Sequence, residues 1–373
     1  MIFVQRDVLQ AELSIIIGGS VKKLTAILFL FVFVMSTVVS YGQQSSSSGD
    51  FNSTIQSLSS DAAKAYVEPV IGSFGSNLNS GWLTKAPSPT KFSFGLDLKI
   101  VAMGSMISDA QKTFSTVGSF SLTDNEAQEI AALMAPYDQT QQDYFKNQLL
   151  STPWQVGISG PTIVGANDQY VKLDFQGKTI NGTPIPNYTL ADVKGFLNNL
   201  SIFPTATIQL GVGTFMGTNV AIRWFPKVNI KDLGDFSYWG FGIMHNPAVW
   251  FDGAELPVDL AVGYFYQDLK VGSVFETKAH MMGVYASKTF GTIIAFTPYV
   301  GLSTESSTTT INYDYTYSDQ GVDVTSNVNF ELDGTNSAAF TVGTAFKLAI
   351  LNLNIDYKFA SVKTLSAGLT FGF

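Results

Sequence analysis

The C-terminal stretch Leu365-Ser366-Ala367-Gly368-Leu369-Thr370-Phe371-Gly372-Phe373 decides the fold of this chain. In an extended strand, successive side chains point to opposite faces. One face of this stretch therefore carries only apolar side chains and ends on an aromatic residue, whereas the other face carries Ser, Gly and Thr. Two interpretations fit this pattern: a half-buried strand of a soluble sheet, and a barrel strand with one face in lipid.

The same alternation recurs over much of the chain and favours the barrel. It is clearest over residues 92–100, 206–212, 220–224, 258–267, 311–317, 322–332 and 351–359. Charged residues make up only 13% of the chain, about half the ~25% usual in soluble domains. No apolar run after residue 42 is long enough for a membrane helix. These features predict an all-β fold, a transmembrane antiparallel β-barrel of about 12–14 strands.

The N-terminal region predicts export. The basic pair Lys22-Lys23 precedes an apolar run over residues 24–39, and Ser40-Tyr41-Gly42 then supplies small residues for cleavage. Basic, apolar and small-residue regions in this order predict a signal peptide over residues 1–42. A permanent anchor is the alternative, although the run is short for the ~20 residues of a membrane span. Residues 1–20 lie upstream of this pattern, and a start at Val21 would make them an extension of the gene model.

The next two segments differ from the barrel in composition. Residues 43–60 are rich in Ser and Gln and predict a linker. Within residues 61–90, apolar residues such as Tyr66, Val70 and Phe74 recur at helical spacing. This segment predicts a small helical plug at the periplasmic end of the barrel, and a helix outside the barrel is the alternative. Residues 91–373 form the predicted barrel.

The barrel region contains a long insertion over residues 105–200. Thr123 and Glu126 form a capping-box pattern that predicts a short helix, and residues 190–200 suggest a second one. Gly, Pro, Asn and Asp residues predict irregular chain elsewhere, with a weak strand over residues 170–175 as an alternative. The insertion is expected either to lie outside the cell or to fill the lumen.

Charge and residue content exclude several functions. The formal net charge of −8 disfavours nucleic acid as a partner, since phosphate binding needs a basic surface. The absence of cysteine excludes disulfides, thiol catalysis and thiolate metal sites. The sequence contains no Gly-x-Ser-x-Gly nucleophile motif, no phosphate-binding loop and no His/carboxylate metal spacing. We therefore expect no enzyme activity, no catalytic residue, no metal and no cofactor.

A small set of charged residues is expected to face the lumen. Glu276, Lys278 and His280 share one strand face and could form a charged lumen patch or a proton-sensitive constriction, or simply a solvated surface. Arg223 and Asp356 occupy the polar face of their own alternating segments, and they are the other candidates for the lumen.

Three segments resemble an uncharacterised family of outer-membrane β-barrel proteins from Bacteroidota-type bacteria. One runs from Gly95-Leu96-Asp97-Leu98 to residues 109–114. The second runs from residues 209–213 through Arg223-Trp224-Phe225-Pro226 to residues 242–246. The third joins residues 345–348 and 356–358 to the closing strand. That family is distantly similar to the outer-membrane transporters of long-chain fatty acids.

The resemblance implies a location and a set of partners. The location is the bacterial outer membrane, with its lipid as one partner and the barrel-assembly machinery as another. Phe371 and Phe373 would belong to the signal that this machinery reads. The leading hypothesis is a pore or transporter for small molecules, with a small hydrophobic ligand as the candidate cargo. A filled structural or surface-interaction barrel is the alternative, and an outer-membrane enzyme is third.

Overall fold

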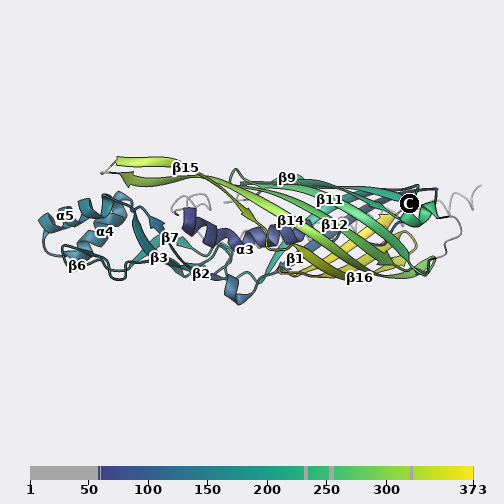
Figure 1. Cartoon of the computed structure of the whole chain (residues 1–373), viewed down its shortest axis with the longest axis horizontal. Coiled ribbons are helices and arrows are strands. Elements are labelled where there is room, and N and C mark those ends of the chain that lie inside the picture. The colour runs from purple at the N-terminus through teal and green to yellow at the C-terminus, as the bar shows by residue number, and fades with distance from the viewer. Residues whose placement is uncertain (1–57, 59, 231–233, 252–255, 320–321, 373) are drawn as a thin grey trace, which may run out of the picture. The chain divides into compact units, whose positions relative to one another are not determined.

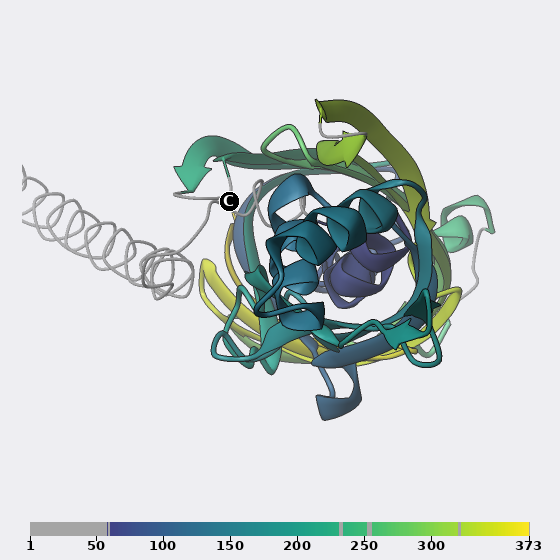
Figure 2. The same cartoon turned by 90° about the vertical axis from the view of Figure 1, so that its left-hand side faces the viewer.

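Ten antiparallel strands close into a barrel in the computed structural model (Figures 1 and 2). The structure describes residues 58, 60–230, 234–251, 256–319 and 322–372. Each strand pairs with its neighbours in the ring, and pairing of β12 with β14 closes it. The ring strands are β1 (Phe92–Met106), β8 (Ile202–Phe215), β9 (Thr218–Ile230), β10 (Gly234–His245), β11 (Asp259–Val271), β12 (Phe275–Ser287), β14 (Ile294–Asp319), β16 (Ala338–Leu348), β17 (Leu351–Phe359) and β18 (Thr364–Gly372).

The barrel fold is confirmed, and the ring holds fewer strands than the expected 12–14. The sheet includes two further strands, β13 (Phe290–Gly291) and β15 (Val322–Asp333). β13 has two residues, and β15 pairs only with β14. β14 is 26 residues long, so the alternating segment over residues 311–317 is its continuation rather than another ring strand.

The two ends of the barrel differ in their connections. At one end, called here the turn end, β1 begins, β18 ends, and short turns join β8 to β9 and β16 to β17. At the other end, called the insertion end, residues 107–201 connect β1 to β8, and the β14–β15 hairpin extends beyond the ring. In Figure 1 the insertion end lies to the left and the C-terminus lies at the turn end.

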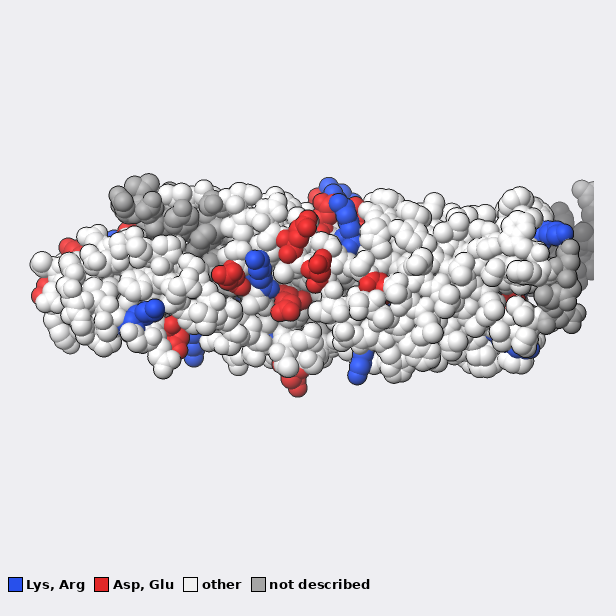
Figure 3. All heavy atoms as spheres, viewed as in Figure 1, with Lys and Arg blue, Asp and Glu red and all other residues white. Residues whose placement is uncertain are grey.

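The outer surface of the ring is apolar toward the turn end. On β17, Leu353 and Ile355 are 59% and 48% exposed, while the intervening Asn354 and Asp356 are 4% and 3% exposed. Exposed apolar side chains occur on all ten strands: Leu98, Val212, Ile222, Phe241, Val262, Val284, Leu302, Val342, Leu353 and Leu365. Figure 3 shows few charged side chains on the barrel wall toward the turn end. An apolar exterior on a closed sheet is what a transmembrane barrel requires.

Substitutions on the closing strand should separate its two faces. Leu369 pairs with Ile100 midway along the outer apolar row of β1, whereas Thr370 is 6% exposed and lines a cavity inside the barrel. Leu369→Arg should destabilise the barrel by ~2–4 kcal/mol, since it places a charge in lipid. Thr370→Arg should cost much less. Urea titration of folding into lipid vesicles, followed by heat-modifiable gel migration, measures both, and equal effects would contradict the assignment of faces.

The insertion is a folded unit, which corrects the expectation of irregular chain. After the short helix η1 (Asp109–Gln111) it contains a four-stranded sheet in the order β2-β3-β4-β7. Its elements are β2 (Thr113–Phe120), α4 (Asp124–Met134), α5 (Gln139–Leu150), β3 (Trp154–Pro161), β4 (Tyr170–Asp174), β5 (Thr179–Ile180), β6 (Thr183–Pro184) and β7 (Tyr188–Lys194). Buried Ile158, Val171 and Leu173 belong to its core.

The capping-box helix is confirmed, and the second expected helix is wrong. The Glu126 backbone N–H donates to the Thr123 hydroxyl, and the Thr123 N–H donates to the Glu126 carboxylate at 2.8 Å. The chain over residues 190–194 instead belongs to β7. There it pairs with β4, so sheet pairing overrides a weak helical spacing.

Candidate functional site: the lumen segment and the side chains that hold it

The interior of the barrel is occupied by the chain's own N-terminal region. Residues 58 and 60–91 are called here the lumen segment, and helix α3 (Ser60–Leu78) forms its first part. Every residue over 69–83 is buried, and Figure 2 shows α3 end-on inside the ring. The plug expected from the sequence is therefore present. The sequence had predicted a plug at the periplasmic end alone. The segment instead begins at the insertion end and continues to the turn end.

Hydrogen bonds fix both ends of the lumen segment. At the insertion end, the Tyr313 hydroxyl of β14 donates to the Leu58 carbonyl at 3.0 Å, and the Tyr66 hydroxyl donates to the Lys194 carbonyl at 2.8 Å. At the turn end, the Asn246 amide donates to the Pro87 carbonyl at 2.8 Å. The segment therefore runs the length of the ring.

Small residues let α3 approach the wall closely. Gly72 and Gly75 lie one turn apart on the helix. A Cβ on Gly75 would come within 2.0 Å of the Ser307 hydroxyl oxygen, and one on Gly72 within 3.2 Å of Val362. Larger side chains at these positions would hold the helix away from the barrel.

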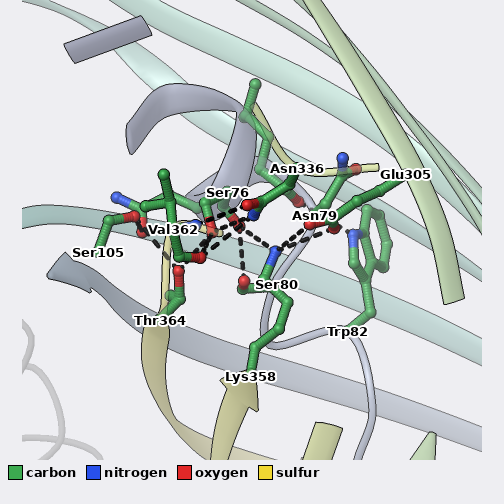
Figure 4. A network of polar contacts seen from close by, with 12 residues as sticks. Ser76, Asn79, Ser80, Trp82, Ser105, Glu305, Asn336, Lys358, Val362 and Thr364 are labelled. Atoms are coloured by element: carbon green, nitrogen blue, oxygen red, sulfur yellow. Dashed lines mark hydrogen bonds and ion pairs between the residues drawn. The ribbon is translucent and has the colours of Figure 1, made fainter. Parts of the chain in front are cut away.

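A buried lysine binds the C-terminal end of α3. Lys358 on β17 donates to the Ser76 carbonyl at 2.8 Å and to both Glu305 carboxylate oxygens at 3.0 and 3.1 Å (Figure 4). The last carbonyls of a helix lack intrahelical partners and carry partial negative charge. A cation at this place therefore satisfies a backbone acceptor and stabilises the helix dipole.

Arg223 on β9 holds the chain just beyond the helix. Its guanidinium donates to the Ser80 carbonyl at 2.8 Å and to Gln209 at 2.8 Å. The guanidinium carbon also lies 3.7 Å from the ring centroid of Trp82, within the range of a cation–π contact. Arg223 is fully buried, and these contacts replace part of the hydration that its guanidinium loses.

Lys99 on β1 supplies a third cation to the same stretch. Its ammonium donates to the carbonyls of Gly81 and Leu83 at 2.9 and 2.8 Å. Gly368 on the neighbouring strand leaves the room for this side chain, since a Cβ there would lie 2.5 Å from the Lys99 Cε. Three barrel strands thus each direct one cation at backbone oxygens of the lumen segment.

Apolar and neutral polar contacts complete the packing. Trp82 packs on Phe265 with ring centroids 4.8 Å apart, and Phe74 packs on Phe203 at 5.1 Å. The Ser76 and Thr364 hydroxyls lie 2.6 Å apart, within the polar network of Figure 4. The lumen segment is packed as a protein interior along most of its length.

A cavity remains between the lumen segment and the turn end. Its volume is about 400 Å³, and its lining includes Lys85, Asp97 and Lys347 together with Trp82 and Phe265. The barrel therefore has a polar vestibule at the turn end and a filled centre.

The candidate lumen residues fall on both sides of the wall. Arg223 and Asp356 lie inside, where the Tyr299 hydroxyl donates to Asp356 at 3.0 Å. Glu276, Lys278 and His280 share one face, but that face is the outer one, which corrects the expectation.

The reason for this correction lies in what fills the barrel. The residues between these three, such as Thr277 and Ala279, are buried on the lumen side, and Phe275 packs on Phe74 of α3 at 6.2 Å. Here the lumen side of β12 packs against α3, and the outer face carries ion pairs, including Glu276 with Lys270 and Lys278 at 3.4 Å.

Sequence reasoning did not select Lys99 or Lys358 as site residues. Each lysine occupies a polar-face position of an alternating segment. That position was the only indication in the sequence that these residues face the lumen. Their partners are backbone carbonyls, which the sequence does not reveal. Of the two proposed assembly residues, Phe371 pairs with Leu351 and Leu98 at the turn end, and Phe373 lies outside the described residues. The predicted signal peptide also lies outside them.

Two further properties concern the described part of the chain. None of its helices is both long and apolar enough to cross a bilayer. Within the same residues, no group of three or more His, Cys, Asp or Glu side chains is placed to bind a metal ion.

The chain belongs to a family of unknown function, DUF6588, whose sequence profile matches residues 21–373. No curated protein matches it. The transport unit of the autotransporter AIDA-I from Escherichia coli is 9% identical, with 81% of this chain and 98% of that chain covered and a TM-score of 0.25. The N-terminal β-barrel domain of OprF from Pseudomonas aeruginosa is 16% identical, with 42% and 98% covered and a TM-score of 0.20. At these values nothing about the activity of those proteins transfers to this chain.

Proposed function

We propose that this protein is an outer-membrane β-barrel that is closed at rest and holds its insertion at the cell surface as an interaction module. The observation that carries the proposal is the continuous burial of residues 69–83 inside the ring, with the folded insertion bonded to the same segment. The Ile163 N–H donates to the Tyr66 carbonyl at 3.0 Å, and β2 packs against α3. A module fixed to the plug in this way has a defined position.

The surface of the insertion supports a role in binding. Leu133 and Tyr137, at and just beyond the end of α4, are 62% and 100% exposed. Exposed aromatic and large apolar side chains are enriched where proteins bind partners. The proposal assigns no catalysis. Its partners are outer-membrane lipid, the barrel-assembly machinery and a surface ligand of the insertion.

Transport of small molecules, hydrophobic ones included, is the second candidate. The vestibule at the turn end favours it, because a cavity of about 400 Å³ can admit a small ligand. Passage through the barrel would require the lumen segment to move aside. The similarity to fatty-acid transporters expected from the sequence stays a prediction, since the family description gives no activity.

Two measurements on the full-length protein test the proposal. The wild-type barrel in planar bilayers should give no stable conductance, because residues 69–83 fill the lumen. A membrane-impermeant maleimide should label Tyr137→Cys on intact cells, since the natural chain has no cysteine and Tyr137 is fully exposed. A steady open channel, or labelling only after the outer membrane is permeabilised, would refute the closed surface-display barrel.

A further inference from the structure

The direction of the lumen segment has a consequence for membrane topology. At the insertion end, the Lys64 ammonium lies 5.3 Å from the ring centroid of Phe330 on β15. At the turn end, the Ala86 N–H donates to the Ser287 hydroxyl at 2.9 Å, and the Gly217 N–H donates to the Thr90 carbonyl at 3.0 Å. The segment thus runs from the insertion end to the turn end, opposite to β1.

The length of the segment is sufficient to cross a bilayer. Helix α3 has 19 residues, which correspond to about 28 Å at 1.5 Å per residue. Residues 79–91 continue the segment up to the residue that precedes β1. The hydrocarbon core of a bilayer is about 30 Å thick.

The electrostatics of the wall favour this direction over the reverse one. Lys358 and Arg223 bond the last carbonyl groups of α3 and of the turn that follows it. The C-terminal end of a helix carries partial negative charge, and its N-terminal end carries partial positive charge. A reversed helix would bring N–H groups to these buried cations and remove the backbone acceptor of each.

We infer that the lumen segment is an eleventh membrane crossing, so that its two ends, Asp61 and Thr90, lie on opposite sides of the membrane. Asp61 lies on the side of the insertion, and Thr90 lies on the side of the C-terminus. The barrel therefore places the start of α3 on the same side of the membrane as the insertion.

The inference rests on the membrane location in the proposed function, but not on the role of the insertion. Asp61→Cys, Thr90→Cys and Tyr137→Cys test it in the full chain, because all three native side chains are exposed and there is no cysteine background. Heat-modifiable migration of each variant first establishes that the barrel has assembled. A membrane-impermeant maleimide is then applied to intact and to permeabilised cells.

Asp61→Cys and Tyr137→Cys are both expected to be labelled in intact cells. Thr90→Cys is expected to be labelled only after the cells are permeabilised. If Thr90→Cys labels together with Asp61→Cys, or if Asp61→Cys follows Thr90→Cys and not Tyr137→Cys, the inference is overturned. If Tyr137→Cys and Asp61→Cys both label only after permeabilisation while Thr90→Cys labels in intact cells, the proposed surface display fails and the eleventh crossing stands.

Discussion

Lys358→Met is expected to lower the free energy of unfolding by about 3–5 kcal/mol, because it leaves the buried Glu305 carboxylate without a cation. The side chains of Lys358 and Glu305 are only 2% and 1% exposed and lie 3.0 Å apart. The substitution also removes the hydrogen bond to the Ser76 carbonyl at the end of α3. Chemical unfolding in lipid vesicles, followed by tryptophan fluorescence, measures the loss.

Two control variants separate the buried charge from general effects. The double variant Lys358→Met/Glu305→Leu should recover much of the loss, since replacing a whole buried pair by apolar residues is often near neutral. Lys270→Met removes the exposed partner of Glu276, where the side chains are 55% and 35% exposed, and should cost no more than ~1 kcal/mol. A loss for Lys358→Met as small as for Lys270→Met would show that the buried pair does not hold the lumen segment.

Deletion of residues 60–90 should convert a silent barrel into a stable ion-conducting channel. The wall that faces this segment carries Lys99, Arg223, Asp356 and Lys358, and such side chains would be solvated once the segment is gone. Single-channel recording in planar bilayers gives the result directly. A deletion variant that assembles but remains silent would mean that the wall closes the lumen by itself.

Gly75→Leu tests the same idea if the deletion variant does not assemble. A Cβ at position 75 would lie 2.0 Å from the Ser307 hydroxyl oxygen, so α3 must move away from β14. Brief openings are expected in place of silence, because the helix stays in the lumen but loses its close contact. Glu68→Leu is the control, since it puts the same side chain on the same helix at an exposed position.

Strand periodicity predicted which residues share a face, because successive side chains of a strand alternate whatever surrounds it. Leu353 and Ile355 lie on one face of β17, as predicted, and Asn354 and Asp356 lie on the other. The prediction also holds for Glu276, Lys278 and His280, which do share one face. Period-two alternation does not state which face is inside. At the level of these three residues the interior is occupied by α3, so the apolar face turned inward and the charged face outward.

The sequence by itself determined the barrel class and the capping-box helix at Thr123, and it left open whether the N-terminal helix lies inside or outside the barrel. The capping-box helix follows from the spacing within one short stretch, whereas the barrel class follows from alternation that recurs over much of the chain. Tertiary structure alone decided the closure at ten strands, the direction of the lumen segment and the roles of Lys99 and Lys358. The ring closes where β12 pairs with β14, and that pairing depends on the course of all the strands between them. The lysines act on backbone carbonyls, which every residue possesses, so no side-chain pattern in the sequence could have identified their partners.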